Sequence, residues 1–108
     1  MTTLPLKKGD RLPVIDVQLI GANGAAVNLT GATVTFTMAS EDGRVISNRA
    51  PATVTAATTG NVRYSWDADD TLQIGTFLCE WVATFAGGLE MTFPNRGYDK
   101  IEVTNRLA

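Results

Sequence analysis

The stretch Val27-Asn-Leu-Thr-Gly-Ala-Thr-Val-Thr-Phe-Thr-Met38 joins a turn to a strand of strict alternation. Successive side chains of a strand point to opposite faces of the sheet. One face would carry Val34, Phe36 and Met38, and the other Thr33, Thr35 and Thr37. A slip of one residue would bring the threonines into the core and expose the large apolar groups. The stretch therefore predicts a sheet with one buried face in a mainly β chain.

Length and composition indicate one globular domain. A chain of 108 residues can form one core but is too short for two. Its 44% of hydrophobic residues include no run of roughly 20 apolar residues, the length that a membrane span needs. The net charge is −2, and nine lysines and arginines are spread along the chain, so no basic stripe matches a row of phosphates. We therefore expect neither a membrane nor a nucleic acid as partner.

The N-terminal segment, residues 1–9, has no apolar periodicity and contains Pro5. We expect an extended arm that a partner or a neighbouring copy orders. The segment lacks the uninterrupted apolar run of a secretory signal, which favours synthesis in the cytoplasm. The single cysteine, Cys79, excludes an internal disulfide, and the absence of histidine removes the commonest imidazole ligand and general base. We expect no cofactor.

Alternation between turn residues predicts further strands. They cover residues 14–20, 33–39, 44–48, 52–56, 62–66, 75–85 and 98–103. Between them, Asp67 to Gln73 is predicted as a short helical turn capped by Asp67, and residues 94–97 as a corner. The close spacing of turn signals favours two packed antiparallel sheets, an all-β sandwich. The expected domain is residues 10–104, with a tail at 105–108.

Two hairpin registers follow from pairing like with like. A three-residue loop ending at Gly24 places Leu19 opposite Val27 and Val17 opposite Leu29. A loop of Ala86-Gly87-Gly88 pairs the strand at 75–85 with the segment that follows the loop. It sets Phe85 against Leu89, Ala83 against Met91 and Trp81 against Phe93.

Candidate chemical groups favour structural roles. Cys79 is predicted on an apolar face between Phe77 and Trp81, without the basic neighbour that a reactive thiol needs. The predicted register separates Glu80 from Glu90 by roughly 13 Å, beyond the spacing of paired glycosidase carboxylates. We therefore expect a protein that is not an enzyme.

Three further motifs have alternative interpretations. Asp67, Asp69 and Asp70 are spaced for a capped acidic turn and lack the glycine and closing glutamate of an EF-hand calcium loop. Residues 28–30 match a glycosylation sequon but favour a turn. Trp66 and Trp81 would support carbohydrate binding if exposed, although their alternation with polar residues favours the core.

Turn and core residues along most of the chain carry a family resemblance. They are Lys8-Gly9-Asp10, Leu12-Pro13, Asn23-Gly24, Val27 to Phe36, Gly43, residues 60–66, Gly75-Thr76-Phe77 and Phe93-Pro94-Asn95. In these positions the chain resembles the immunoglobulin-like N-terminal domain of phage baseplate upper proteins and related small phage virion proteins. The resemblance implies an immunoglobulin-like fold and a virion building block without catalytic activity.

The resemblance also implies partners and a location. We expect a structural component of a tailed phage virion, in the head, the head-to-tail connector, or the tail and baseplate. Family members generally continue into receptor-binding segments, whereas this chain ends at Ala108, which favours a free-standing head, connector or tail component. The expected partners are other virion proteins and copies of the chain. The expected contact residues are Leu4, Leu6, Lys7, Lys8, Thr33, Thr35 and Thr37. An adhesin-like or carbohydrate-binding sandwich is the alternative.

Overall fold

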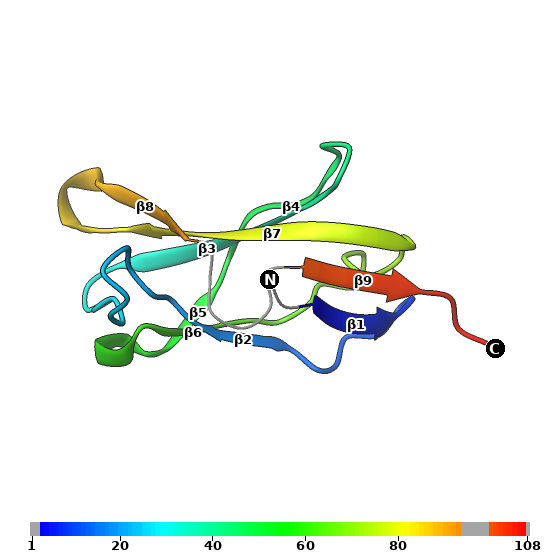
Figure 1. The fold of residues 1–108 in the computed structure, drawn as a ribbon, viewed down its shortest axis with the longest axis horizontal. Helices are drawn as coiled ribbons and strands as arrows, with labels where there is room; N and C mark the ends of the chain where they lie inside the picture. The colour runs from blue at the N-terminus through cyan, green and yellow to red at the C-terminus, as the bar shows by residue number, and fades with distance from the viewer. Residues whose placement is uncertain (1–2, 94–99, 108) are drawn as a thin grey trace.

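The computed structural model describes residues 3–93 and 100–107, and within them the chain forms nine strands in two packed sheets (Figure 1). The strands are β1 (Thr3–Lys7), β2 (Ile15–Gln18), β3 (Thr33–Ser40), β4 (Val45–Pro51), β5 (Thr53–Ala56), β6 (Asn61–Tyr64), β7 (Gly75–Thr84), β8 (Glu90–Phe93) and β9 (Lys100–Thr104). Two short 3-10 turns, Ala57–Thr59 and Ala86–Gly88, connect strands. The expected all-β sandwich is confirmed.

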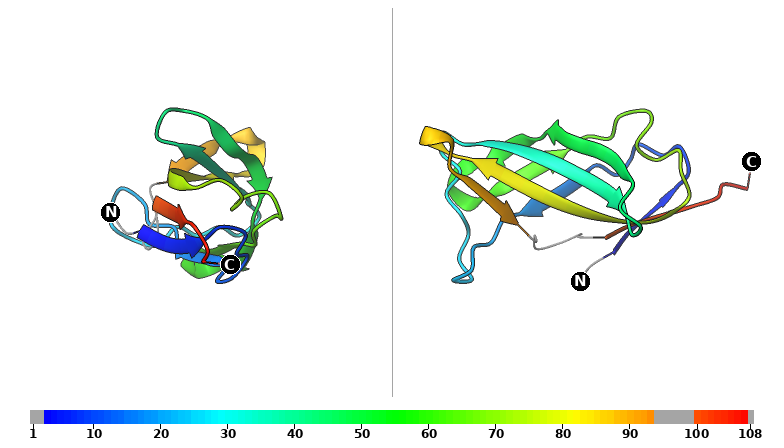
Figure 2. Two further views of the ribbon diagram at one scale, coloured as in Figure 1. Left: turned by 90° about the vertical axis from the view of Figure 1, so that its right-hand side faces the viewer. Right: turned by 90° about the horizontal axis from the view of Figure 1, so that it is seen from above.

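The larger sheet has the strand order β1-β9-β7-β3-β4, and β8 pairs with the second half of β7. The smaller sheet has the order β2-β6-β5. Seen along the long axis, the two sheets form the layers of an elongated molecule of 46 × 21 × 21 Å (Figure 2). The pairing of β1 with β9 is parallel, so the expectation of antiparallel pairing throughout is wrong for that pair.

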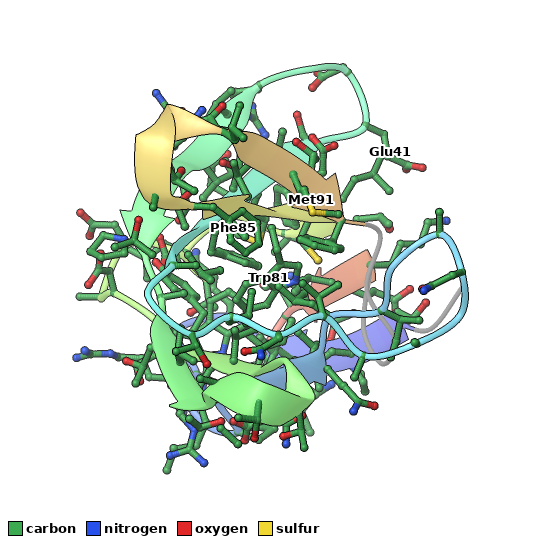
Figure 3. All side chains as sticks on the ribbon, turned by 90° about the vertical axis from the view of Figure 1, so that its left-hand side faces the viewer. Glu41, Trp81, Phe85 and Met91 are labelled. Atoms are coloured by element: carbon green, nitrogen blue, oxygen red, sulfur yellow. The ribbon has the colours of Figure 1, made fainter. Side chains whose placement is uncertain are left out.

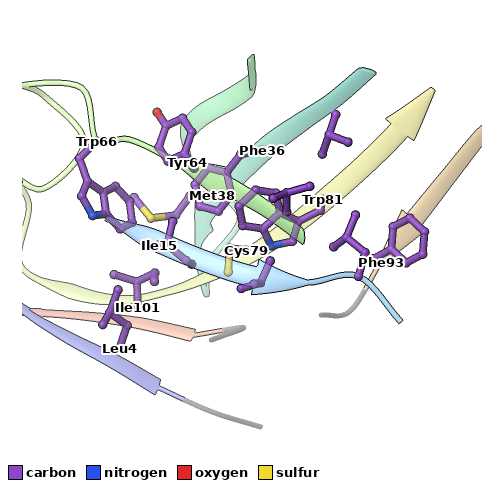
Figure 4. Close-up of a cluster of buried hydrophobic side chains, with 14 of the residues drawn as sticks. Leu4, Ile15, Phe36, Met38, Tyr64, Trp66, Cys79, Trp81, Phe93 and Ile101 are labelled. Carbon is purple, nitrogen blue, oxygen red and sulfur yellow. The ribbon is translucent and has the colours of Figure 1, made fainter. Parts of the chain in front are cut away.

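The core lies between the sheets, as the alternation of β3 predicts. Val34, Phe36 and Met38 are buried, and β3 pairs with β7 over its whole length, with Phe36 opposite Trp81 and Met38 opposite Cys79. The ring of Phe36 stacks on Tyr64 of the smaller sheet at a centroid distance of 4.3 Å. Figure 4 shows these side chains filling the space between the two layers. Aromatic contacts therefore join one sheet to the other.

The β7–β8 hairpin has the predicted register, with Trp81 opposite Phe93 and Ala83 opposite Met91. In the earlier hairpin, Ile20 pairs with Ala26 and the Val27 N–H donates to the Leu19 carbonyl, as a three-residue loop requires. That ladder does not continue to the predicted pair of Val17 and Leu29. Instead Val17 pairs with Val62 in β6, and the Leu29 N–H donates to the Ala57 carbonyl.

Gly60 lies where three backbone segments meet. Its φ of 72° is in the left-handed region, and a Cβ there would lie 2.8 Å from the Val27 carbonyl oxygen and 2.9 Å from that of Leu19. No other residue fits such an approach without displacing backbone. The glycine thus permits β6 to begin directly against the first hairpin.

The predicted helical turn is a hydrogen-bonded turn and forms no helix. The Asp70 N–H donates to the Asp67 carbonyl at 3.1 Å, and the turn extends to Thr71 before bends at Leu72 and Gln73. The predicted cap is also reversed, because the carboxylate of Asp70 accepts from the Asp67 N–H at 2.9 Å. The buried position of Asp70 decides which carboxylate faces the backbone.

The N-terminal segment expected as an arm is part of the sandwich. Residues 3–7 form β1, which pairs with β9 and buries Leu4 and Leu6 in the core. The domain therefore begins at Thr3 rather than at Asp10. Residues 105–107 extend beyond β9, as expected for a tail (Figure 2). The predicted corner at 94–97 and the first two residues of the predicted last strand lie outside the described residues.

Candidate protein-protein interface

The threonines expected as a flat contact surface lie on the outer face of the larger sheet. Thr33 is exposed, while Thr35 and Thr37 are half-buried. Across β7 they face Thr84, Val82 and Glu80 in turn. The polar face predicted from the alternation is therefore present but is partly covered.

An ion pair lies across this polar face and covers part of it. Arg49 of β4 and Glu90 of β8 meet at 2.6 Å between Nη2 and Oε2. Because β3 and β7 lie between those two strands in the sheet order, the paired side chains cross the outer surface above them. Beneath, Val82 is only 9% exposed although it points outward, and the Thr35 hydroxyl is buried with no hydrogen-bond partner among residues 3–93 and 100–107. We call this ion pair the Arg49–Glu90 strap.

The strap is a feature that the sequence did not reveal, because its two residues are 41 positions apart and both look like ordinary surface charges. Its placement depends on β4. Arg49 has a φ of 52° and lies within the irregularity between the Phe36–Ala50 and Met38–Ser47 pairs, and its N–H donates to the Thr37 hydroxyl at 3.0 Å. The bulged strand thus turns the arginine over the face of the sheet.

The expected contact residues of the N-terminal segment separate into two groups. Leu4 and Leu6 are each 4% exposed and belong to the core, so their expected role on a free surface is wrong in this fold. Lys7 and Lys8 are exposed. The sequence signal that matches their burial is one short alternation, Thr3-Leu4-Pro5-Leu6-Lys7, which Pro5 interrupts.

An apolar surface that the sequence analysis did not single out lies at the tip of the β7–β8 hairpin. Leu89 is 72% exposed and Met91 is 43% exposed. Met91 borders a hollow of about 350 Å³ whose other walls include Ile20 and Phe93. In Figure 3, Met91, Phe85 and Trp81 lie along the inner side of the larger sheet at this end of the sandwich.

A second group of exposed apolar side chains lies at the opposite end of β7. Leu72 and Ile74 precede the first residue of β7 and are 46% and 49% exposed. Leu12, in the connection from β1 to β2, is 74% exposed. Exposed apolar groups mark candidate contact surfaces where several lie together, so both ends of the elongated domain offer surface suited to protein contacts.

Ser47, Tyr64 and Asp70 form a buried polar cluster between the sheets. The Asp70 carboxylate accepts from the Ser47 hydroxyl and from the Tyr64 hydroxyl, each at 2.6 Å. Burial raises the pKa of Tyr64, and the hydrogen bond to Asp70 adds to the increase. Ser47 belongs to β4 and Tyr64 to β6, so the carboxylate ties both sheets to the 67–70 turn. This use is structural.

The other candidate chemical groups are also placed in structural positions. Cys79 is buried in the core. Glu90 lies opposite Thr84, as predicted, and its carboxylate is paired with Arg49 rather than directed at Glu80. Within residues 3–93 and 100–107, no three acidic or cysteine side chains gather as a metal site. In the same residues, no helix has the length and apolar character needed to cross a membrane.

The tryptophans and the sequon match the structural interpretations. Trp66 and Trp81 are 2% and 0% exposed, which confirms their predicted place in the core. The Asn28 side-chain oxygen accepts from the Thr30 N–H at 3.0 Å, so this segment is a turn closed by asparagine.

Comparisons with known proteins bear on the fold alone. No family model matches the chain, and no curated protein matches it. Among solved structures, the crystal structure of CopC from Methylosinus trichosporium OB3b superposes with a TM-score of 0.53 at 9% sequence identity. The match covers 100% of this chain and 89% of that one. At this identity the likeness supports the β-sandwich architecture.

Proposed function

We propose that this chain is a non-enzymatic structural component of a tailed phage virion, in the head, the head-to-tail connector, or the tail and baseplate, and that it acts through protein-protein contacts. The observation that carries the proposal is the exposure of apolar side chains at both ends of an elongated sandwich, with Leu89 and Met91 at one end and Leu72 and Ile74 at the other. Two apolar ends suit a subunit with a neighbour on each side.

The use made of polar groups supports the same proposal. The buried carboxylate of Asp70 is engaged by Ser47 and Tyr64, and the carboxylates of Asp16 and Glu90 are paired with arginines. These groups hold the fold together and do not converge on a shared hollow. The resemblance to baseplate upper proteins rests on turn and core residues such as Gly60 and Phe36, so it supports the fold and the choice of virion, while the surface supports the contacts.

The carbohydrate-binding alternative depends on an exposed tryptophan. Stacking on a sugar ring needs an exposed aromatic face, and both indole rings are in the core.

The proposal is tested on virions purified from the lysate of cells that encode this chain. Particles are labelled with a gold-conjugated antibody raised against the folded domain, and with pre-immune antibody as the control. Label at one regular place on the particle supports the proposal and identifies the head, the connector or the tail. Purified particles in which neither gold labelling nor mass spectrometry detects the chain would overturn the proposal.

A further inference from the structure

β1 is held in the sandwich along one side only. It is the outermost strand of the larger sheet, and its ladder to β9 runs from Thr3 opposite Lys100 to Lys7 opposite Thr104. Its inward residues, Leu4 and Leu6, lie opposite Ile101 and Val103 of β9 and are almost completely buried. β1 thus fills a slot, formed by the β9 edge and the adjoining core, with two apolar anchors.

The connection from β1 to β2 is anchored firmly after residue 9. The Asp10 carbonyl accepts from the Thr71 hydroxyl at 2.8 Å, the Arg11 guanidinium donates to the Trp66 carbonyl at 3.0 Å, and the Trp66 indole donates to the Pro13 carbonyl at 2.9 Å. These bonds tie residues 10–13 to the segment that precedes β7. They involve no residue of β1.

A single turn joins the anchored connection to β1. The Asp10 N–H donates to the Lys7 carbonyl at 2.9 Å, and Gly9, the third residue of this turn, has a φ of 87°. A positive φ at that position brings the chain back on itself, and glycine adopts negative φ equally well. Two further backbone bonds hold the hinge, because the Lys8 N–H donates to the Thr104 carbonyl at 2.8 Å and the Gly9 N–H donates to the Thr71 carbonyl at 2.9 Å. With Gly9 extended, β1 would leave its slot and these two bonds would be given up, while residues 10–13 kept theirs.

We propose that β1 is an exchangeable strand, and that the slot along β9 docks β1 from a second copy of this chain. A strand supplied by a neighbour restores the same register and buries the same two leucines, so the exchanged and closed forms differ mainly at the Lys7–Asp10 turn. High local concentration favours exchange. The inference rests on the proposed function in one respect only: within a virion, the exchanged strand would be the segment that joins copies of this chain.

Mixed single-cysteine copies test the exchange directly. Every copy, including those of the control pair, carries Cys79→Ala to remove the native cysteine. One preparation adds Thr3→Cys and the other Lys100→Cys, positions that face each other across β1 and β9. The preparations are mixed, incubated at high protein concentration and oxidised mildly. A disulfide between positions 3 and 100 of different copies, identified by peptide mass spectrometry, is the expected result, since it requires β1 of one copy to lie in the slot of the other.

The control pair is Thr37→Cys mixed with Glu80→Cys, which face each other across the central strands β3 and β7. Neither strand can leave without loss of the core. Intermolecular disulfide at positions 3 and 100 that does not exceed the yield of this control would overturn the proposal. This result would leave the labelling of virions unaffected, so the two proposals fail independently.

A hinge variant provides the second test. Gly9→Ala penalises the positive φ of the closed turn without a steric clash, since the nearest atom to a Cβ there is Arg106 Nη1 at 3.6 Å. Gly43→Ala is the matched control, with a φ of 94° and no atom within 4 Å. We expect about tenfold more dimer for Gly9→Ala than for the unsubstituted chain, the population shift that left-handed strain produces. Gly43→Ala should show no increase. Equal monomer content in both variants at all concentrations would contradict the exchange.

Discussion

Trp66 and Trp81 are both buried, yet their indole N–H groups are in different situations. The Trp66 N–H donates to the Pro13 carbonyl at 2.9 Å, whereas that of Trp81 has no partner within the described part of the chain. A buried donor without a partner costs about 1 to 3 kcal/mol. The two rings therefore contribute unequally to stability despite equal burial.

Replacement of each tryptophan by phenylalanine measures this difference. Both changes remove ring area, but Trp66→Phe also leaves the Pro13 carbonyl without its donor, while Trp81→Phe removes an unsatisfied N–H. We expect Trp66→Phe to lower the free energy of unfolding by about 1 to 2 kcal/mol more than Trp81→Phe, measured by urea denaturation. The reverse order would show that the Trp81 N–H is satisfied in solution.

Tyr64 gives the stability a dependence on alkaline pH. Its folded-state pKa is raised above the ordinary 10.0 by burial first and by Asp70 second. A raised folded pKa means that the contribution is complete below the unfolded value and is lost as the pH rises above it. We expect the free energy of unfolding to fall above pH 10, and Tyr64→Phe to lack that part of the decline.

The control for the pH experiment is the difference between the two proteins. Every other ionisable group is the same in Tyr64→Phe, so the difference isolates the Tyr64 hydroxyl. Identical alkaline declines in the two proteins would contradict the role given to the Tyr64 hydroxyl.

At the scale of elements, the Arg49–Glu90 strap connects β4 to β8 across two intervening strands. Both side chains are about half exposed, so their electrostatic coupling in a double-mutant cycle should be only about 0.2 to 1 kcal/mol and should decrease with salt. We expect the arginine stem to cover apolar surface around Val82 as well. Arg49→Ala is therefore expected to destabilise more than the coupling alone accounts for.

Arg63 provides the matched control. It pairs with Asp16 at 2.7 Å, on the outer face of the smaller sheet and directly opposite it on the neighbouring strand. We expect a similar coupling for that pair in denaturant unfolding, with a smaller effect of Arg63→Ala than of Arg49→Ala. Equal effects of the two single substitutions would mean that the strap covers nothing.

The elements that the sequence predicts well are those whose information is local. Alternation decided the faces of β3 and β7, and loop length decided the register of the β7–β8 hairpin. β1 was missed because Pro5 and a short apolar pattern resemble an irregular arm, and its burial depends on β9, almost a hundred residues away. The strap and the Ser47–Tyr64–Asp70 cluster were missed for the same reason, since each is assembled from distant, individually ordinary residues.

At the scale of the whole molecule, the two sheets share one core, in which Phe36 of the larger sheet stacks on Tyr64 of the smaller. A shared core favours unfolding in a single cooperative transition. We expect the denaturation curves from circular dichroism and from tryptophan fluorescence to coincide. Phe36→Ala should shift both by the same amount, about 3 to 5 kcal/mol. Separate transitions for the two probes would show that the sheets unfold independently.

The parallel pairing of β1 with β9 also determines how the domain bears a mechanical load. β1 begins beside Lys100, and β9 ends beside Lys7, so tension applied between the two ends of the chain pulls the strands past each other along their length. All the hydrogen bonds of the pair are then stressed in shear at the same time, whereas an antiparallel pair pulled from adjacent ends would open one bond after another. The outermost strand is thus the part of the molecule that resists stretching first.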